Sequence, residues 1–117
     1  MKYLLLIYYD EQSLAKAEEA QIMEECGQFT EKLKSSGHWL AADRLHPTST
    51  ATSVRSKGSQ RFVTDGPFAE TREQLGGYCL IEAKDLDEAI EIAGQLPPGR
   101  LGTVEVRPIL DYPATNP

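Results

Sequence analysis

The sequence has few basic residues and no cluster of them. Twelve Lys and Arg are scattered singly among its 117 residues, against eighteen Asp and Glu, and the net charge is -6. Proteins that bind the phosphate backbone of nucleic acids need Lys and Arg gathered on one surface. This charge balance therefore predicts that nucleic acid is not a partner.

Long apolar runs are also missing. The longest, residues 3–9, is far shorter than the roughly twenty residues that a membrane-spanning helix needs. One lysine precedes this run and Asp10-Glu11 follows it directly, which is unlike the apolar core of a secretion signal. We therefore expect a cytoplasmic protein that does not associate with membranes.

Cysteine and histidine are scarce, with two residues of each. Cys26 and Cys79 lack the spacing of a metal-binding motif, which predicts buried, reduced thiols and no metal. A catalytic cysteine would need a neighbouring His or Lys, and this remains the alternative. His38 follows Gly37 at the expected end of a helix, where a cation is favourable without any chemistry. No phosphate-binding loop or dinucleotide fingerprint is present, so we expect no cofactor.

Hydrophobic periodicity and turn residues divide the chain into strands and two helices. Gln12 or Ser13 is predicted to cap the first helix, and Gly37 to stop it in a left-handed conformation. Asp85 is predicted to cap the second helix, with Glu88 completing an acidic capping box. The expected strands are 2–9, 39–42, 51–55, 60–64, 75–83 and 103–109, the expected helices reach from 12 or 13 to 36 and from 86 to 96, and an irregular tail begins at residue 111.

Each expected helix has an apolar stripe that faces the sheet. Members of a stripe recur at helical spacing, three or four residues apart. The stripe of the first helix is Ile22, Cys26, Phe29 and Leu33, and that of the second is Leu86, Ala89, Ile90, Ala93 and Leu96.

The order of elements predicts a single domain, residues 1–117, with a ferredoxin-like α+β sandwich fold and an extra hairpin. Right-handed crossovers place both helices on one face of an antiparallel sheet. Residues 2–9 and 78–81 are nevertheless apolar at odd and even positions alike, whereas a sheet with one wet face alternates. A second copy of the chain is the simplest cover for the other face, which predicts a homodimer.

The stretch FVTDGPFAETREQLGGYCLIEA, residues 62–83, places tight-turn residues, charges and two glycines between two strands. Asp65 either accepts hydrogen bonds from its own Asp-Gly-Pro turn or presents a carboxylate beside a cleft, as a candidate catalytic proton acceptor. Gly76 and Gly77 weaken a strand unless a bulge or a close approach requires them. They therefore indicate either a bulge or the floor of a pocket that binds a ligand.

The charged residues of this stretch have two interpretations. Glu70, Arg72 and Glu73 form either a solvated charge run or, with Asp65 and Tyr78, the lining of a polar ligand-binding pocket at the sheet edge. Asp65 with Glu70 or Glu73 would supply an acid and a base from like residues, because two carboxylates in one cleft share a proton.

His46 is the second candidate catalytic residue. It lies between Leu45 and Pro47 in an expected loop. Close to Asp43 or Asp65 it would act as a general base, and otherwise it is a surface histidine.

The segment VTDGPFAETREQLGGYCLIEAKDLDEAIEIA closely resembles the DGPF branch of the YCII-related proteins. The segments MKYLLLIYYDE, TATSVR and VEVRPI match that branch too, so the resemblance covers nearly the whole chain. It implies a ferredoxin-like fold that dimerises sheet to sheet as a dimeric α+β barrel, in agreement with the pattern of apolar residues.

The resemblance implies less about activity. For relatives of the YCII type it implies an enzymatic role that rests on a His and an Asp, but the segment that matches the histidine region offers Phe29. Members of the DGPF branch accompany extracytoplasmic-function sigma factors, which implies a regulatory role. The segment ADRL, residues 42–45, replaces a usual Gly-Glu pair, and relatives mostly lack a histidine at position 46. Neither ADRL nor His46 therefore inherits a role.

Three functions follow as hypotheses. The first is a homodimer that binds a small molecule in a polar pocket near the Asp-Gly-Pro turn. The second is a non-catalytic regulatory module that acts with a sigma factor. The third is a small acid–base enzyme that uses Asp65.

Overall fold

The secondary structure follows the predicted order of elements. In the computed structural model, residues 1–111 are described, and the predicted irregular tail lies outside the described residues from position 112 on. Short 3-10 helices occur at Glu11–Ser13, Thr48–Thr50 and Pro97–Leu101. The longer elements are β1 (Lys2–Tyr9), α1 (Lys16–Ser35), β2 (Trp39–Arg44), β3 (Thr52–Lys57), β4 (Gln60–Asp65), β5 (Gln74–Glu82), α2 (Leu86–Ala93) and β6 (Gly102–Pro108).

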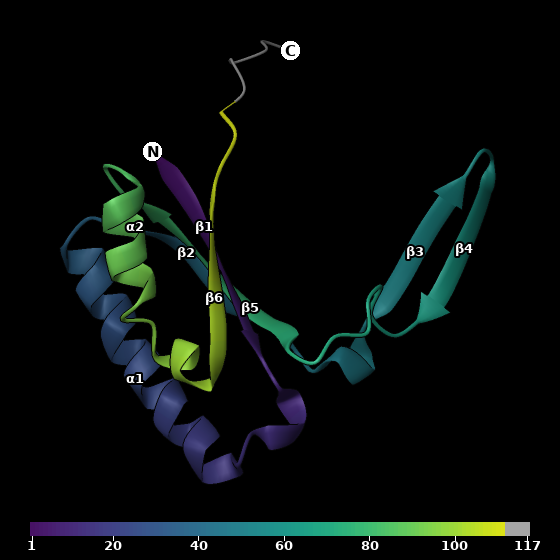
Figure 1. Ribbon diagram of the computed structural model, residues 1–117, viewed down its shortest axis with the longest axis horizontal. Coiled ribbons are helices and arrows are strands. Elements are labelled where there is room, and N and C mark those ends of the chain that lie inside the picture. Colours follow the sequence, from purple (N-terminus) through teal and green to yellow (C-terminus); the bar gives the residue numbers. More distant parts are fainter. Residues whose placement is uncertain (112–117) are drawn as a thin grey trace.

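The main sheet has four antiparallel strands in the order β2-β5-β1-β6. Helices α1 and α2 lie side by side on one face of this sheet (Figure 1). Strands β3 and β4 pair only with each other and form a hairpin that stands apart from the sheet (Figure 1). The predicted α+β class is confirmed, and the strand order is consistent with a ferredoxin-like sandwich that carries an extra hairpin.

Alternation along β1 shows which face of the sheet is covered. Tyr3, Leu5, Ile7 and Tyr9 are buried under the helices, whereas the side chains between them are half-buried. Successive side chains of a strand point to opposite faces, so these others lie on the face without helices. The buried core is Tyr3, Leu5, Ile7, Tyr9, Leu33, Cys79, Ile81, Ala83, Ala89, Ile92, Ala93 and Leu96.

Helix α1 begins at Lys16, so the prediction that Gln12 or Ser13 caps it is wrong. Both residues bond to Asp10 instead. Its carboxylate accepts hydrogen bonds from the Gln12 N–H at 3.0 Å and from the Ser13 hydroxyl at 2.9 Å. This local bonding forms a separate 3-10 helix before the chain turns into α1. The N-cap position of α1 falls on Ala15, which has no side chain to cap it.

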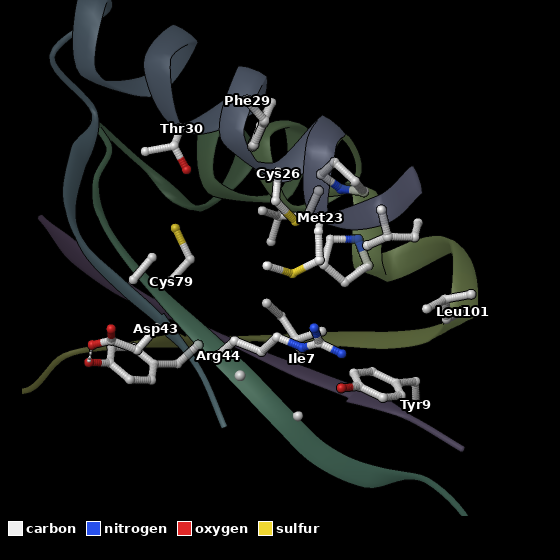
Figure 2. Close-up of a pocket in the computed structure, with 18 of the residues that line it drawn as sticks. Ile7, Tyr9, Met23, Cys26, Phe29, Thr30, Asp43, Arg44, Cys79 and Leu101 are labelled. Atoms are coloured by element: carbon white, nitrogen blue, oxygen red, sulfur yellow. Dashed lines mark hydrogen bonds between the residues drawn. The ribbon is translucent and has the colours of Figure 1, made fainter. Parts of the chain in front are cut away.

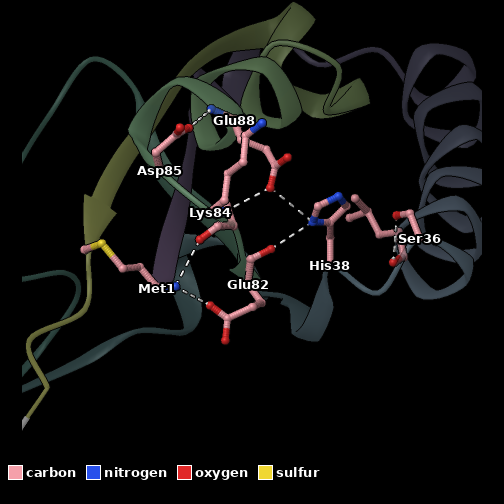
Figure 3. Close-up of polar contacts among 9 residues, drawn as sticks. Met1, Ser36, His38, Glu82, Lys84, Asp85 and Glu88 are labelled. Atoms are coloured by element: carbon pink, nitrogen blue, oxygen red, sulfur yellow. Dashed lines mark hydrogen bonds and ion pairs between the residues drawn. The ribbon is translucent and has the colours of Figure 1, made fainter.

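The start of α2 is held by polar contacts that also fix His38 (Figure 3). Asp85 accepts a hydrogen bond from the Glu88 N–H at 2.9 Å, as the capping prediction requires. The carboxylate of Glu88 accepts a hydrogen bond from the N–H of Lys84, one residue before the N-cap, at 3.0 Å. His38 Nδ1 lies 2.9 Å from the Glu82 carbonyl oxygen and 3.7 Å from Glu88 Oε1. His38, the residue before β2, therefore contacts both β5 and the start of α2.

The apolar stripe of α2 differs from the prediction at three positions. Leu86 and Ile90 are exposed, whereas Ile92 is buried. The helix presents Ala89 and Ala93 to the sheet, since these small side chains allow a close approach, and Ile92 shares their side of the helix. Among residues 1–111, no helix is long and apolar enough to cross a membrane.

Two strands extend two residues further than predicted. Strand β2 continues to Arg44, which pairs with Gly77 of β5. Strand β3 continues to Lys57, which pairs with Gln60, so that the hairpin closes through Gly58 and one further residue. Gly58 has a φ of +61°, a left-handed conformation that favours glycine.

Candidate functional site

A cavity of about 200 Å³ lies between α1 and the sheet (Figure 2). Its walls are largely apolar, and they come from α1, from β1, β2 and β5, and from the segment that follows α2. The apolar side chains that line it are Ile7, Leu14, Ile22, Met23, Cys26, Phe29, Leu33, Ala42, Cys79, Leu96, Pro97, Pro98 and Leu101. The predicted stripe of α1 is therefore one wall of this cavity.

Gly76 and Gly77 form part of the opposite wall, and the structure shows why each must be a glycine. A β-bulge interrupts the pairing of β1 with β5 here, and Gly76 is the extra residue. A Cβ on Gly76 would lie 2.2 Å from Cε1 of Tyr9, whose ring covers it. A Cβ on Gly77 would lie 2.9 Å from the carbonyl oxygen of Asp43 in β2. The bulge interpretation is confirmed, and the same two glycines also border the cavity.

The polar end of the cavity is built around Arg44. Its Nη2 lies 2.6 Å from Oε1 of Glu19, in an ion pair that joins β2 to α1. Partial burial acts to lower the pKa of Arg44, but the Glu19 carboxylate and the nearby Tyr9 hydroxyl outweigh it, so the pKa is raised. The guanidinium stays charged at every physiological pH and has five N–H donors to offer. Donors that Glu19 does not occupy remain for a ligand.

A second, more polar hollow of about 340 Å³ adjoins this end, and His46 lines it. Tyr9, Glu19 and Arg44 border both spaces. The loop beside His46 is fixed by Glu11, whose carboxylate accepts hydrogen bonds from the N–H of Thr48 at 2.9 Å and from its hydroxyl at 2.8 Å. An amphipathic molecule could thus place an apolar group in the cavity and a polar group toward this hollow.

Two thiols face the cavity, one from α1 and one from β5 (Figure 2). Burial raises the pKa of Cys26, and it raises the pKa of Cys79 to about 11. Both are therefore neutral thiols near neutral pH, and a neutral thiol is a poor nucleophile. Both cysteines are free; Cys79 is buried as predicted, whereas Cys26 is only half-buried. Nothing here supports a catalytic cysteine.

Tyr78 is among the residues that border the cavity, but its side chain points to the other face of the sheet. Its hydroxyl donates a hydrogen bond to Oδ2 of Asp43 at 2.7 Å. This bond raises the pKa of Tyr78, with desolvation as a smaller cause. Because side chains alternate along β5 and β2, this pair lies on the face without helices, while Cys79 and Ala42 face the cavity.

The Asp-Gly-Pro turn lies at the base of the hairpin. Gly66, with a φ of +103°, donates its N–H to the Ala51 carbonyl at 2.8 Å, and its own carbonyl accepts a hydrogen bond from the Ser53 hydroxyl at 2.7 Å. These bonds hold the turn through its backbone. Asp65 is exposed, and within residues 1–111 its carboxylate makes no hydrogen bond to its own turn.

The other predicted site residues lie in the loop after the turn. Glu70 and Arg72 are exposed, and Glu73 accepts a hydrogen bond from the Thr103 hydroxyl at 2.9 Å. Neither they nor Asp65 line the cavity between α1 and the sheet. Their roles in a polar pocket stay predictions.

Arg44 and Glu19 are the functional candidates that the sequence did not reveal. They lie 25 positions apart, and only the packing of α1 on β2 brings them together. One signal was available: Arg44 is two residues from Ala42 in the same strand, so it points to the helix side of the sheet, where a charge is unusual.

The chain is similar in sequence to known proteins. The YCII-related domain family matches residues 1–113. The chain belongs to this family. An uncharacterized protein from Rhizobium meliloti (strain 1021) is 37% identical over 117 residues, a match that covers 96% of this chain and 94% of that protein. Both matches extend over nearly the whole chain.

Proposed function

We propose that this YCII-related protein binds a small molecule in the cavity between α1 and the sheet. The observation that carries the proposal is the combination of an apolar, partly enclosed space with a paired guanidinium, that of Arg44, at one end. Ligand sites are typically apolar clefts with a few well-placed polar groups. The ligand is of one chemical class: a single ring or a short branched chain that carries a carboxylate or a carbonyl oxygen.

The size of the cavity supports a ligand of this class. An apolar cavity of about 150 Å³ holds a molecule of benzene, and this one measures about 200 Å³. An acceptor oxygen on the ligand would meet the free N–H groups of Arg44 at the boundary with the hollow that contains His46. Gly76 and Gly77, which were expected to border a ligand, line this cavity on the wall opposite α1.

Benzoate and toluene are the probes, and ligand-observed NMR and calorimetry measure their binding. We expect both to bind the wild type, because both fit the apolar space. Arg44→Gln should weaken benzoate about tenfold, as loss of one charge-assisted hydrogen bond does, and leave toluene unchanged. Ala42→Leu should exclude both probes by filling the cavity.

Arg107→Gln is the matched control. Arg107 pairs with Glu105 on β6 and does not line the cavity, so its loss should change neither probe. Failure of both probes to bind the wild type, or binding that Ala42→Leu leaves intact, would refute the cavity as the site.

This proposal has three further parts. The chain belongs to the DGPF branch, it forms a sheet-to-sheet homodimer with an α+β barrel, and it is cytoplasmic. The motifs DGPF at positions 65–68 and LGGY at 75–78 support the branch. The apolar character of both faces of β1 supports the dimer.

A regulatory module that acts with a sigma factor is the second candidate. The net charge of -6 supports it, since an acidic surface suits a basic protein partner. So does Phe68, in the loop after the hairpin, whose side chain is 81% exposed. An acid–base enzyme that uses Asp65, alone or with His46, has less support. No hydrogen bond or ion pair joins Asp65 to another ionisable side chain in the described part of the chain.

A further inference from the structure

We propose that the hairpin formed by β3 and β4, residues 52–65 and here called the arm, grips the acidic body of a second copy of this chain. The inference rests on the homodimer proposed above and goes beyond it, because a sheet-to-sheet contact does not by itself involve the arm. Three properties of the arm carry the proposal: its position, its exposed apolar side chains and its charge.

The arm stands away from the rest of its own chain (Figure 1). Its two strands pair with each other and with no strand of the main sheet. The radius of gyration is 16.4 Å, whereas a compact domain of this length has a radius of about 13 Å. Two of the three molecular dimensions reach 47 Å and the third only 21 Å. The chain is therefore broad and flat, with its arm extended.

The arm exposes apolar side chains on both of its faces. Val54 and Val63 are directly opposed across the two strands and are 60% and 63% exposed. Phe62, opposite Arg55, lies on the other face and is 49% exposed. A two-stranded hairpin is marginally stable in water unless another element covers it. Covering both faces would supply the apolar burial that its own chain does not give.

Charge identifies what covers the arm. The sequence scatters its basic residues, yet three of them lie on the hairpin, Arg55 and Lys57 on the face of Phe62 and Arg61 on the opposite face. Within residues 1–111 none of them pairs with a carboxylate, although Arg55 lies 5.8 Å from the centre of the Phe68 ring. With Asp65 the arm has three basic residues and one acidic residue, a net charge of +2. The rest of the chain, here called the body, has nine basic and seventeen acidic residues and a net charge of -8. The charges of arm and body add to the -6 of the whole chain.

A second copy of this chain fits these charges better than nucleic acid does. Two bodies of net charge -8 would repel each other unless the basic arms intervened, and an arm laid on the partner's body opposes unlike charges. In a two-fold dimer the contact occurs twice, since each arm meets the other body. A phosphate backbone laid on one face of the arm would meet only some of these basic residues and would be repelled by the acidic body behind them.

Two triple variants with the same change in net charge test the proposal. Arg55→Gln/Lys57→Gln/Arg61→Gln removes the charge of the arm. Lys16→Gln/Arg72→Gln/Lys84→Gln removes three exposed body charges that make no ion pair within the described residues. The dimer dissociation constant is measured by sedimentation at two salt concentrations. The arm variant should dissociate about tenfold more readily at low salt, as loss of several interfacial charge pairs predicts, and the body variant should not.

The second measurement locates the contact. A photoreactive amino acid replaces Phe62, and chains grown on light and heavy nitrogen are mixed before illumination. The proposal predicts cross-links between one light and one heavy chain, at residues outside 52–65. Cross-links within one chain, or between two arms only, would overturn it.

The remaining outcomes separate the arm from the dimer. If the wild type stays dimeric and both triple variants dissociate alike, the arm inference fails while the dimer stands. A wild type that is monomeric at every concentration overturns both. Binding of a DNA duplex that the arm variant loses, with an unchanged dimer dissociation constant, would assign the arm to nucleic acid and overturn the inference.

Discussion

At the scale of single residues, the thiol of Cys79 gives the protein a pH-dependent stability. Its pKa lies at about 11 in the fold, above the ordinary value of 9.0, because burial disfavours the thiolate. Between pH 9 and 11 the unfolded chain loses this proton and the folded chain keeps it. The free energy of unfolding should therefore fall by about 2 kcal/mol across this window.

Comparison of variants isolates this thiol from the other groups that titrate at alkaline pH. Unfolding by urea is followed at pH 8 and at pH 10.5 for the wild type, Cys79→Ala and Cys26→Ala. Cys79→Ala should lose the contribution of about 2 kcal/mol to the pH dependence, whatever its stability at pH 8. Cys26→Ala should keep it. An equal pH dependence in the wild type and Cys79→Ala would show that the thiol is accessible to water in the fold.

The candidate site also shows what single residues reveal in a sequence. Gly76 and Gly77 were recognisable because a double glycine inside a strand has no local reason. Arg44 and Glu19 were not, because their role depends on a contact between residues 25 positions apart. The cavity itself was not predictable either, since a pattern of apolar positions fixes which side chains face each other and not how completely they fill the space between them.

At the scale of elements, the bulge in β5 brings Gly76 into close contact with the ring of Tyr9. Gly76→Ala would place a Cβ 2.2 Å from Cε1 of Tyr9. The ring is buried, and to make room for this Cβ it has to shift toward the cavity and the hollow that it borders. We expect the substitution to cost about 1–3 kcal/mol of stability, as overpacking of a core does, measured by urea unfolding.

Gly27→Ala in α1 is the matched control for this substitution. No atom lies within 4 Å of a Cβ at Gly27, and alanine is favoured over glycine in a helix by about 1 kcal/mol. The control should therefore be stabilised. In a Tyr9→Leu background the cost of Gly76→Ala should fall, because the ring that it strikes is gone. A cost that is unchanged in that background would mean that the backbone of the bulge, and not the ring, requires glycine.

Elements with strong local signals were predictable, and those with competing signals were not. The stop of α1 at Gly37 and the cap of α2 at Asp85 depend on residues whose local preferences agree with the fold. The start of α1 was misplaced because Asp10 bonds the two residues expected to act as caps. The stripe of α2 was misassigned because Ala89 and Ala93 face the sheet together with Ile92, which leaves the larger Leu86 and Ile90 exposed.

At the scale of the whole molecule, the open face of the sheet has the composition of an interface. Its centre, on β1 and β5, holds half-buried Leu4, Leu6 and Leu80. The edge strand β6 alternates, and it presents Glu105 and Arg107 to this face. An apolar centre with a charged rim is typical of contacts between proteins, and no described element of the same chain covers it.

The sheet-to-sheet dimer is tested by a charge at the centre of this face. Leu6→Glu should convert a dimer of twice 13.0 kDa into a monomer of 13.0 kDa, because an unpaired carboxylate buried between two sheets costs several kcal/mol. Light scattering at micromolar concentration measures the mass, and circular dichroism checks the fold. Leu86→Glu, on the exposed side of α2, introduces the same charge without touching the open face and should stay dimeric. A wild type of 13.0 kDa would exclude the dimer. If both variants dissociate alike, the cause is a general effect of charge. If Leu6→Glu alone dissociates, the contact lies on the sheet face that the helices leave uncovered.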